Sequence, residues 1–328
     1  MDVTLVRSLL DPAVLFFFFG LFAAAVRSNL EVPPAIAKFF SLYLLMSIGF
    51  KGGVSLAQTG FTTSMLLALG AALTLAFVIP AYSYVILRRR LNAFDAAAVA
   101  ATYGSVSAVT FIAANSFIEQ QGVMPGGYMS AALVLMESPA VLMAVVLANH
   151  ARQAGTQPGT IPKEDVSMKN ILHEAFTDGA QLLLLGSLLI GVLTGEHGKK
   201  VLDPFTGMIQ KGILAFFLLE MGLLVGRRFR DIDKSSRGFI ALFGLVAPPV
   251  NAALAASLAH LLGLPLGDAF ILCVLAASAS YIVVPAVVRH AIPEANAGLY
   301  FSMALVVTFP FNIAVGIPLY FAVLKALW

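Results

Sequence analysis

Ten long apolar segments fill most of this chain and constrain its fold more than any other feature. A helix needs about 20 mostly apolar residues to cross the hydrocarbon core of a bilayer. With 59% hydrophobic and only 11% charged residues, the chain has too few polar groups to cover itself as a water-soluble fold. We therefore predict an all-α polytopic membrane protein of about ten transmembrane helices, over residues 11–27, 35–50, 64–87, 95–118, 128–149, 178–195, 205–226, 238–262, 268–290 and 298–325.

One long polar stretch, Asn149 to Asp178, leaves five predicted helices on each side. Because five is odd, homologous halves would have to lie in opposite orientations in the membrane. We predict a first five-helix repeat at 1–150, a cytoplasmic linker at 151–175 and a second, inverted five-helix repeat at 176–328.

Short patterns recur in the two halves, in the same order and at nearly constant spacing. Gly49 and Gly53 are followed 173 residues later by Gly222 and Gly226. These glycines form G-x-x-x-G patterns, which favour close helix approach but identify no function. Two further matches support an internal repeat: Gly104-Ser105-Val106-Ser107 with Ala277-Ser278-Ala279-Ser280, again 173 apart, and Gly127 and Pro139 with Gly298 and Pro310, 171 apart.

Basic residues are unevenly distributed between the predicted connections. The odd-numbered connections hold 14 of the 20 Lys and Arg residues, and the even-numbered side holds 6. Cytoplasmic loops carry the excess of Lys and Arg, so the odd connections and the central loop are predicted to be cytoplasmic and both termini outside. The same distribution accounts for the pI near 9.0 without nucleic-acid binding.

Two predicted helices are interrupted by small and hydroxyl residues, at Gly104–Thr110 and at Ser278–Tyr281. A break inside a span leaves a half-helix N-terminus that suits a small anion, and free carbonyls and hydroxyls that suit sodium. The alternative is that small residues only permit close packing. The matched pair favours a binding site, with these candidate residues: Gly104, Ser105, Ser107, Thr110, Ser278, Ser280 and Tyr281.

A second matched pair contains proline, at Pro139 and Pro310, which frees a carbonyl one turn earlier. Glu137 is an ionisable residue inside a span, which suggests a function, although a structural carboxylate is the equal alternative. Glu137, Thr308 and Asn312 are candidates for a sodium site or its support. Asn312 is also expected, with Asn115 and Asn251, to form hydrogen bonds between helices.

Several motifs of other protein classes are missing from the sequence. It contains no H-E-x-x-H, no P-loop Gly-Lys-Ser/Thr and no G-x-S-x-G. The five histidines form no ligand pair at i, i+4, and one cysteine cannot form an internal disulfide. We expect neither an enzyme nor a bound cofactor, and we expect no ATP-driven transport by this chain alone.

The chain resembles the sodium-dependent bicarbonate transporters of the SbtA type, from about Leu42 to Tyr320. The segments that carry the resemblance are Leu45–Gly53, Tyr103–Ser107 with Thr110, Met136–Ala140, Glu220–Gly222, Val246–Pro248, and Ala276–Ser278 with Ser280, Pro285 and Ile292-Pro293. The resemblance implies a core domain and a gate domain in an elevator-like mechanism. It also implies a homotrimer in a bacterial inner membrane, bicarbonate import driven by sodium, and a PII-like cytoplasmic regulator.

The chain departs from the family pattern at several positions. Val109 replaces a serine, Val283-Val284 replace Ser-Gly, and Glu137 replaces an aspartate. Tyr281 stands where the family has an acid. Loss of this acid is expected to weaken sodium coupling or to alter the substrate. The alternatives are a sodium- or proton-coupled carrier of a small organic acid, and a membrane sensor without net flux.

Overall fold

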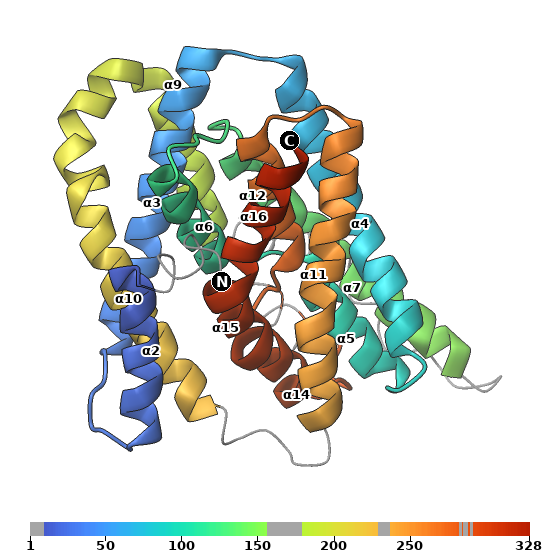
Figure 1. Cartoon of the computed structure of the whole chain (residues 1–328). Coiled ribbons are helices and arrows are strands. Elements are labelled where there is room, and N and C mark those ends of the chain that lie inside the picture. The colour runs from blue at the N-terminus through green and yellow to red at the C-terminus, as the bar shows by residue number, and fades with distance from the viewer. Residues whose placement is uncertain (1–9, 156–178, 229–236, 282–283, 285–287, 289–290) are drawn as a thin grey trace.

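The computed structural model describes residues 10–155, 179–228, 237–281, 284, 288 and 291–328, and all regular secondary structure within them is helical (Figure 1). Most of the predicted linker at 151–175 therefore lies outside the described residues. The helices are α2 (Pro12–Ala25), α3 (Pro34–Thr59), α4 (Thr63–Leu87), α5 (Ala93–Gly104), α6 (Ala108–Gln120), α7 (Met129–Gly155), α9 (Gly179–Thr206), α10 (Met208–Arg228), α11 (Arg237–Leu261), α12 (Leu266–Ala277), α14 (Ala297–Ser302), α15 (Phe309–Phe311) and α16 (Ile317–Leu327).

Eight helical segments of the described residues are long and apolar enough to cross a membrane. They include 93–120, which spans the junction of α5 and α6, and 297–327, which spans α14 to α16. The predicted span 11–27 coincides with α2, an apolar helix of 14 residues. The first part of the predicted span 268–290 is in α12, an apolar helix of 12 residues, and most of residues 282–290 lie outside the described residues. The chain is a multi-pass, all-helical membrane protein, and the count of ten spans stays a prediction.

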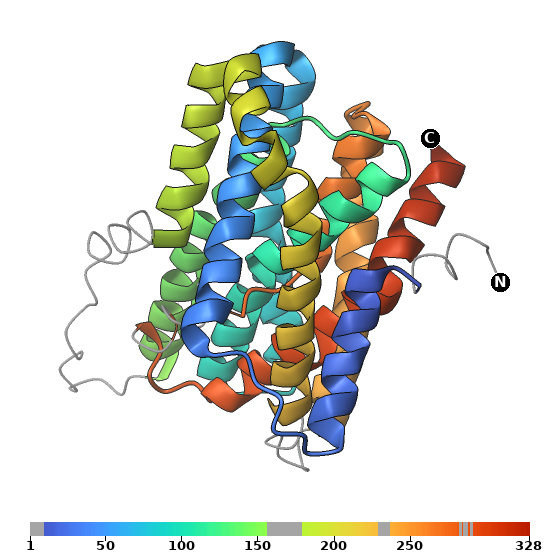
Figure 2. The same cartoon turned by 90° about the vertical axis from the view of Figure 1, so that its left-hand side faces the viewer.

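Four helices, α2, α3, α9 and α10, form a layer on one side of the molecule, which faces the viewer in Figure 2. Within this four-helix layer α3 packs along α9, and α10 packs along α2. A Cβ at Gly53 would collide with the carbonyl oxygen of Leu188, and one at Gly222 with that of Phe17. The two G-x-x-x-G patterns therefore permit close helix approach, as the sequence predicted.

The remaining helices form the body of the protein, behind this layer. Its centre contains small residues. The run Ala96–Ala101 of α5 is alanine except for Val99, and every residue in it is fully buried. Gly104 lies against the ring of Pro80 in α4, where a Cβ would come within 2.6 Å of the proline Cγ. Helix α6 contacts α12 of the body on one side and α3 of the layer on the other (Figure 1).

Two helices depart from regular α geometry. Helix α9 bends at Gly195, whose φ of 50° is accessible to glycine, and then continues to Thr206. The predicted span 178–195 ends at this bend. In the last helix, π-type turns at Met303–Thr308 and Asn312–Gly316 flank Pro310. Wider turns accommodate a proline that cannot donate its backbone hydrogen bond, and such turns are frequent at functional sites.

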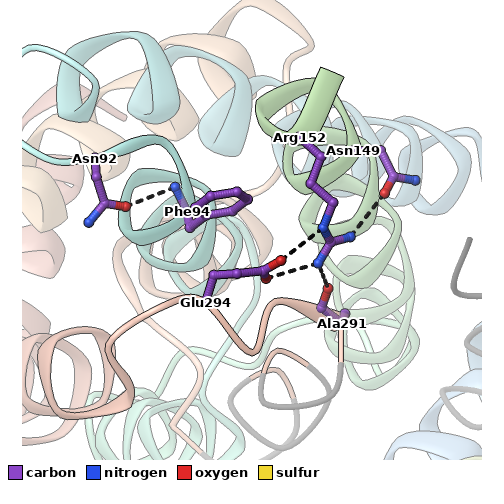
Figure 3. A network of polar contacts seen from close by, with 6 residues as sticks. All are labelled: Asn92, Phe94, Asn149, Arg152, Ala291 and Glu294. Atoms are coloured by element: carbon purple, nitrogen blue, oxygen red, sulfur yellow. Dashed lines mark hydrogen bonds and ion pairs between the residues drawn. The ribbon is translucent and has the colours of Figure 1, made fainter. Parts of the chain in front are cut away.

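One polar network fastens the end of α7 to the segment before α14 (Figure 3). Arg152 forms a two-pronged ion pair with Glu294, with N···O distances of 3.1 and 3.0 Å. The same guanidinium donates to the carbonyl of Ala291 at 2.8 Å and to Asn149 at 3.1 Å. This planar, multiply bonded arrangement fixes the position of residues 291–294 against the body.

Candidate functional site

Both interrupted helices are broken at the predicted positions. Helix α5 ends at Gly104, and the backbone is extended at Ser105 (φ −95°, ψ −179°) and Ser107 (φ −105°, ψ 112°) before α6 begins. Helix α12 ends at Ala277, and Ser278 is also extended (φ −84°, ψ 170°). The prediction of two helix breaks is therefore confirmed.

The two breaks lie against each other inside the protein. The backbone N–H of Ser107 donates to the hydroxyl of Ser278 at 2.9 Å. In the opposite direction, the N–H of Ser280 donates to the carbonyl of Thr102 at 2.9 Å. These two bonds join segments about 170 residues apart in the chain and satisfy backbone groups that the breaks release. Ser107, Ser278 and Ser280 are thus brought together as predicted.

At each break a serine hydroxyl accepts a backbone N–H from a residue three or four positions further along the chain. The Ser107 hydroxyl accepts the N–H of Thr110 at 3.2 Å and the hydroxyl of Thr110 at 2.9 Å. The Ser280 hydroxyl accepts the N–H of Val284 at 3.2 Å. The first N–H groups of a helix have no partner within the helix, and the serine satisfies only one of them at α6. The N-terminus of α6 therefore retains donors and a partial positive charge at the break.

Two buried hydroxyl groups at the breaks have no hydrogen-bond partner among the described residues. They belong to Ser105, which is 1% exposed, and Tyr281, which is 5% exposed. Buried polar groups are normally paired, and an unpaired one costs about 1–3 kcal/mol. Each hydroxyl can donate a hydrogen bond to an oxyanion. Together with the α6 N-terminus they supply donors for a small anion without a buried Lys or Arg.

Tyr281 lies where the body meets the four-helix layer. Its ring packs edge-on against Phe309 with a centroid distance of 5.6 Å, and Phe309 packs in the same way against Phe17 of α2. Its hydroxyl lies beside Ser107 and within electrostatic range of Glu220 in α10. On α3 of the layer, the hydroxyl of Ser47 is likewise buried without a partner in the described part of the chain. The candidate site is therefore at the boundary between layer and body.

The residues predicted to support a sodium site have structural partners. Asn312 donates to the carbonyl of Ala277, the last residue of α12, at 2.9 Å and accepts from Tyr320 at 3.0 Å. It thus stabilises the second break directly. A carbonyl oxygen has two lone pairs, so the Ala277 carbonyl retains capacity for a second contact.

Thr308 links the first break to α11. The hydroxyl of Tyr103 is 2.6 Å from that of Thr308, which donates to the carbonyl of Gly244 at 2.9 Å. Because Thr308 donates to Gly244, Tyr103 is the donor in the first bond. Glu137 is buried within α7 at 7% exposure.

The other asparagines have different roles. Asn251 accepts the Tyr82 hydroxyl of α4, as expected for a bond between helices. Asn115 was predicted to form a hydrogen bond between helices, and this prediction is wrong. Its side-chain amide donates to the carbonyl of Phe111 in its own helix at 2.9 Å.

Sequence reasoning missed a pair of carboxylates at the starts of the broken helices. Asp95 lies in the first turn of α5, and its carboxylate accepts the N–H of Asn296 at 2.7 Å. Asp268 lies in the first turn of α12, where it accepts the N–H of Gly126 at 2.6 Å and the hydroxyl of Tyr128. The two aspartates are 173 residues apart, which is the spacing of most of the other matches between the halves. This spacing is the sequence signal that could have identified them.

A comparison with known proteins identifies the family. The family model of the Na+-dependent bicarbonate transporter superfamily matches residues 12–325, nearly the whole chain. No curated protein matches the sequence. The chain belongs to the Na+-dependent bicarbonate transporter superfamily, and it is a membrane transporter rather than an enzyme.

Proposed function

We propose that this member of the superfamily imports bicarbonate by sodium symport and binds the anion between its two helix breaks. The observation that carries the proposal is the pair of buried hydroxyls of Ser105 and Tyr281 at those breaks, which find no hydrogen-bond partner among the described residues. The expected ligands of the anion are these hydroxyls, the α6 N-terminus at Ser107 and Thr110, and the Ser278–Ser280 segment.

Neutral donors suit this anion because it must be released as well as bound. A buried cation would attract bicarbonate strongly, whereas helix N–H groups and hydroxyls attract it through dipoles. Bicarbonate is small and has oxygens on every side, so several short donors converging from two chain segments match it. Binding would relieve the cost of the two unpartnered hydroxyls, which is about 1–3 kcal/mol for each.

We propose that sodium binds close by, on oxygen ligands. The carbonyls released by the breaks are the natural candidates, with Glu137, Thr308 and Asn312 in supporting roles. Many of these carbonyls already accept a bond, as those of Thr102 and Ala277 do. With Tyr281 in place of the family acid, we expect weaker sodium dependence than in relatives that retain it.

Three features support the proposal of two inverted five-helix repeats with ten spans. The contact of Gly49 and Gly53 with α9 has a counterpart in that of Gly222 and Gly226 with α2. The breaks pair with each other, and at each a serine hydroxyl accepts a backbone N–H from further along the chain. The two first-turn aspartates each bind the segment that precedes the last helix of the other half. Such crossed contacts are expected of repeats related by a two-fold axis in the membrane plane.

We further propose that the four-helix layer is the gate and the body is the moving core of an elevator-like mechanism. The position of the site at their boundary supports this division, because relative movement would expose it to either side. The homotrimer, the PII-like regulator, the bacterial inner membrane and the outside location of both termini rest on the family resemblance and the charge count.

The variant Tyr281→Phe tests the site, because it removes a hydroxyl that lies beside Ser107 but makes no hydrogen bond of good geometry to any described residue. We expect unchanged or slightly higher thermal stability and a several-fold higher KM for bicarbonate uptake into proteoliposomes. Ser105→Ala should behave in the same way. Thr74→Val is the matched control, since its hydroxyl is exposed and bonds only to its own helix.

Unchanged uptake kinetics in both site variants would contradict the proposed site. Uptake of small carboxylates but not of bicarbonate would favour the organic-acid carrier. Tight binding of an anion without any flux would favour a sensor.

A further inference from the structure

A cavity of about 410 Å³, which is lined by none of the candidate site residues, lies between the four-helix layer and the body. Its walls are α3, α6, the segment 124–130 and the residues around the turn from α9 to α10. Exposed side chains of Met124 and Met208 form part of its rim, so it opens at the surface. Its volume is within the range of small-molecule sites, which is about 300–1,000 Å³.

The floor of this cavity approaches the candidate site. Phe111 follows Thr110 in α6, and Ile48 follows Ser47 in α3; both line the cavity and are buried. The cavity therefore ends beside the breaks and is separated from them by apolar side chains. It opens on the face of the membrane that has few Lys and Arg residues, which the charge count predicts to be the outer face.

Lys51 lines the cavity, and its ammonium is held only by a solvent-accessible ion pair and a long hydrogen bond. The ammonium of Lys51 on α3 is 2.9 Å from a carboxylate oxygen of Glu119 on α6 and 3.5 Å from the amide oxygen of Gln210 on α10. The side chains of Lys51 and Glu119 are 38% and 34% exposed. Ion pairs this accessible are worth about 0–1 kcal/mol, so an arriving anion can displace Glu119 at little cost. A second lysine, Lys211, and a second carboxylate, Asp203, also line the cavity.

We propose that this cavity is an outer vestibule that captures a small oxyanion on Lys51, with Glu119 as the resting counter-ion. The ammonium binds the charged oxygens. The amide oxygen of Gln210 accepts a hydrogen bond from the hydroxyl group of bicarbonate, and chloride and nitrate have no such donor. Lys51 thereby raises the local anion concentration at the floor of the cavity. The identity of the ligand and the inward direction rest on the proposed function; the anion site itself does not.

Cysteine labelling tests the vestibule without measuring transport. In Ser116→Cys, a thiol lines the cavity, while the native Cys273 is fully buried. The measured quantity is the rate at which an anionic methanethiosulfonate labels this thiol from outside, divided by the rate for a cationic one. We expect the added change Lys51→Gln to lower this ratio several-fold. Lys199→Gln is the matched control, because Lys199 is an exposed lysine that pairs with Glu196 and does not line the cavity. Bicarbonate should slow the labelling, and equimolar chloride should slow it less.

The outcomes separate this inference from the proposed function. A labelling ratio that Lys51→Gln leaves unchanged, or a thiol that does not react in monodisperse protein, overturns the vestibule even if bicarbonate is transported. A ratio that depends on Lys51, in protein that transports no bicarbonate, supports the vestibule as an anion site and contradicts the proposed substrate.

Discussion

Asp268 is a buried and Asp95 an accessible carboxylate at equivalent positions of the two halves. Substitution of each by alanine therefore compares the loss of the same group in two environments. Asp268 is 2% exposed and accepts two hydrogen bonds, from the N–H of Gly126 and the hydroxyl of Tyr128. Asp95 makes the equivalent contact with Asn296 at the surface. We predict that Asp268→Ala destabilises the protein considerably more than Asp95→Ala.

The expected magnitudes follow from what each substitution leaves behind. Asp268→Ala leaves a partly buried N–H, at about 1 kcal/mol, and a buried hydroxyl, at about 1–3 kcal/mol, without an acceptor, so the total loss is about 2–4 kcal/mol. Asp95 accepts from the N–H of Asn296 and from the side-chain amide of Asn92, and water can replace it as the acceptor for both, so the loss is that of two exposed hydrogen bonds, about 1–2 kcal/mol. Asp268→Asn retains one acceptor oxygen and should lie between the two.

Thermal unfolding in detergent, followed by intrinsic fluorescence or by loss of the monodisperse peak, measures this order. We expect the lowest Tm for Asp268→Ala, an intermediate Tm for Asp268→Asn, and a Tm near that of the wild type for Asp95→Ala. Equal Tm values for the two alanine variants, or a lower value for Asp95→Ala, would refute the reasoning from burial.

Two further predictions concern packing and the network at the end of α7. Gly53→Leu drives a side chain into the carbonyl of Leu188, so we expect loss of folded protein on gel filtration, whereas Gly186→Leu, with open space around it, should be tolerated. Arg152→Gln removes the ion pair with Glu294 and should cost about 1–2 kcal/mol, seen as a lower Tm with an unchanged KM for uptake.

The sequence predicted the helix breaks because their cause is local. Small and hydroxyl residues such as Ser105 and Ser278 interrupt an apolar run, and the interruption recurs at a fixed spacing. Likewise, the close approach of α3 to α9 follows from Gly49 and Gly53, whose missing side chains allow it.

Features that depend on long-range geometry were not predictable in the same way. The bond from Ser107 to Ser278 requires that two distant segments meet, and no local pattern encodes which atoms then remain unpartnered. Lys51 was not predicted to bind an anion, because a cavity has no signature in one sequence. The bend at Gly195 carries α9 beyond the predicted span because glycine tolerates a positive φ.

The central claim is that the paired breaks bind bicarbonate and couple it to sodium. The most direct test is uptake of labelled bicarbonate into proteoliposomes, with and without an inward sodium gradient, by the wild type and by the double variant Ser107→Ala, Ser278→Ala. The account predicts sodium-stimulated uptake that the double variant loses while it remains monodisperse. Full uptake by that variant, or no uptake by well-folded wild type under any gradient, would contradict the account.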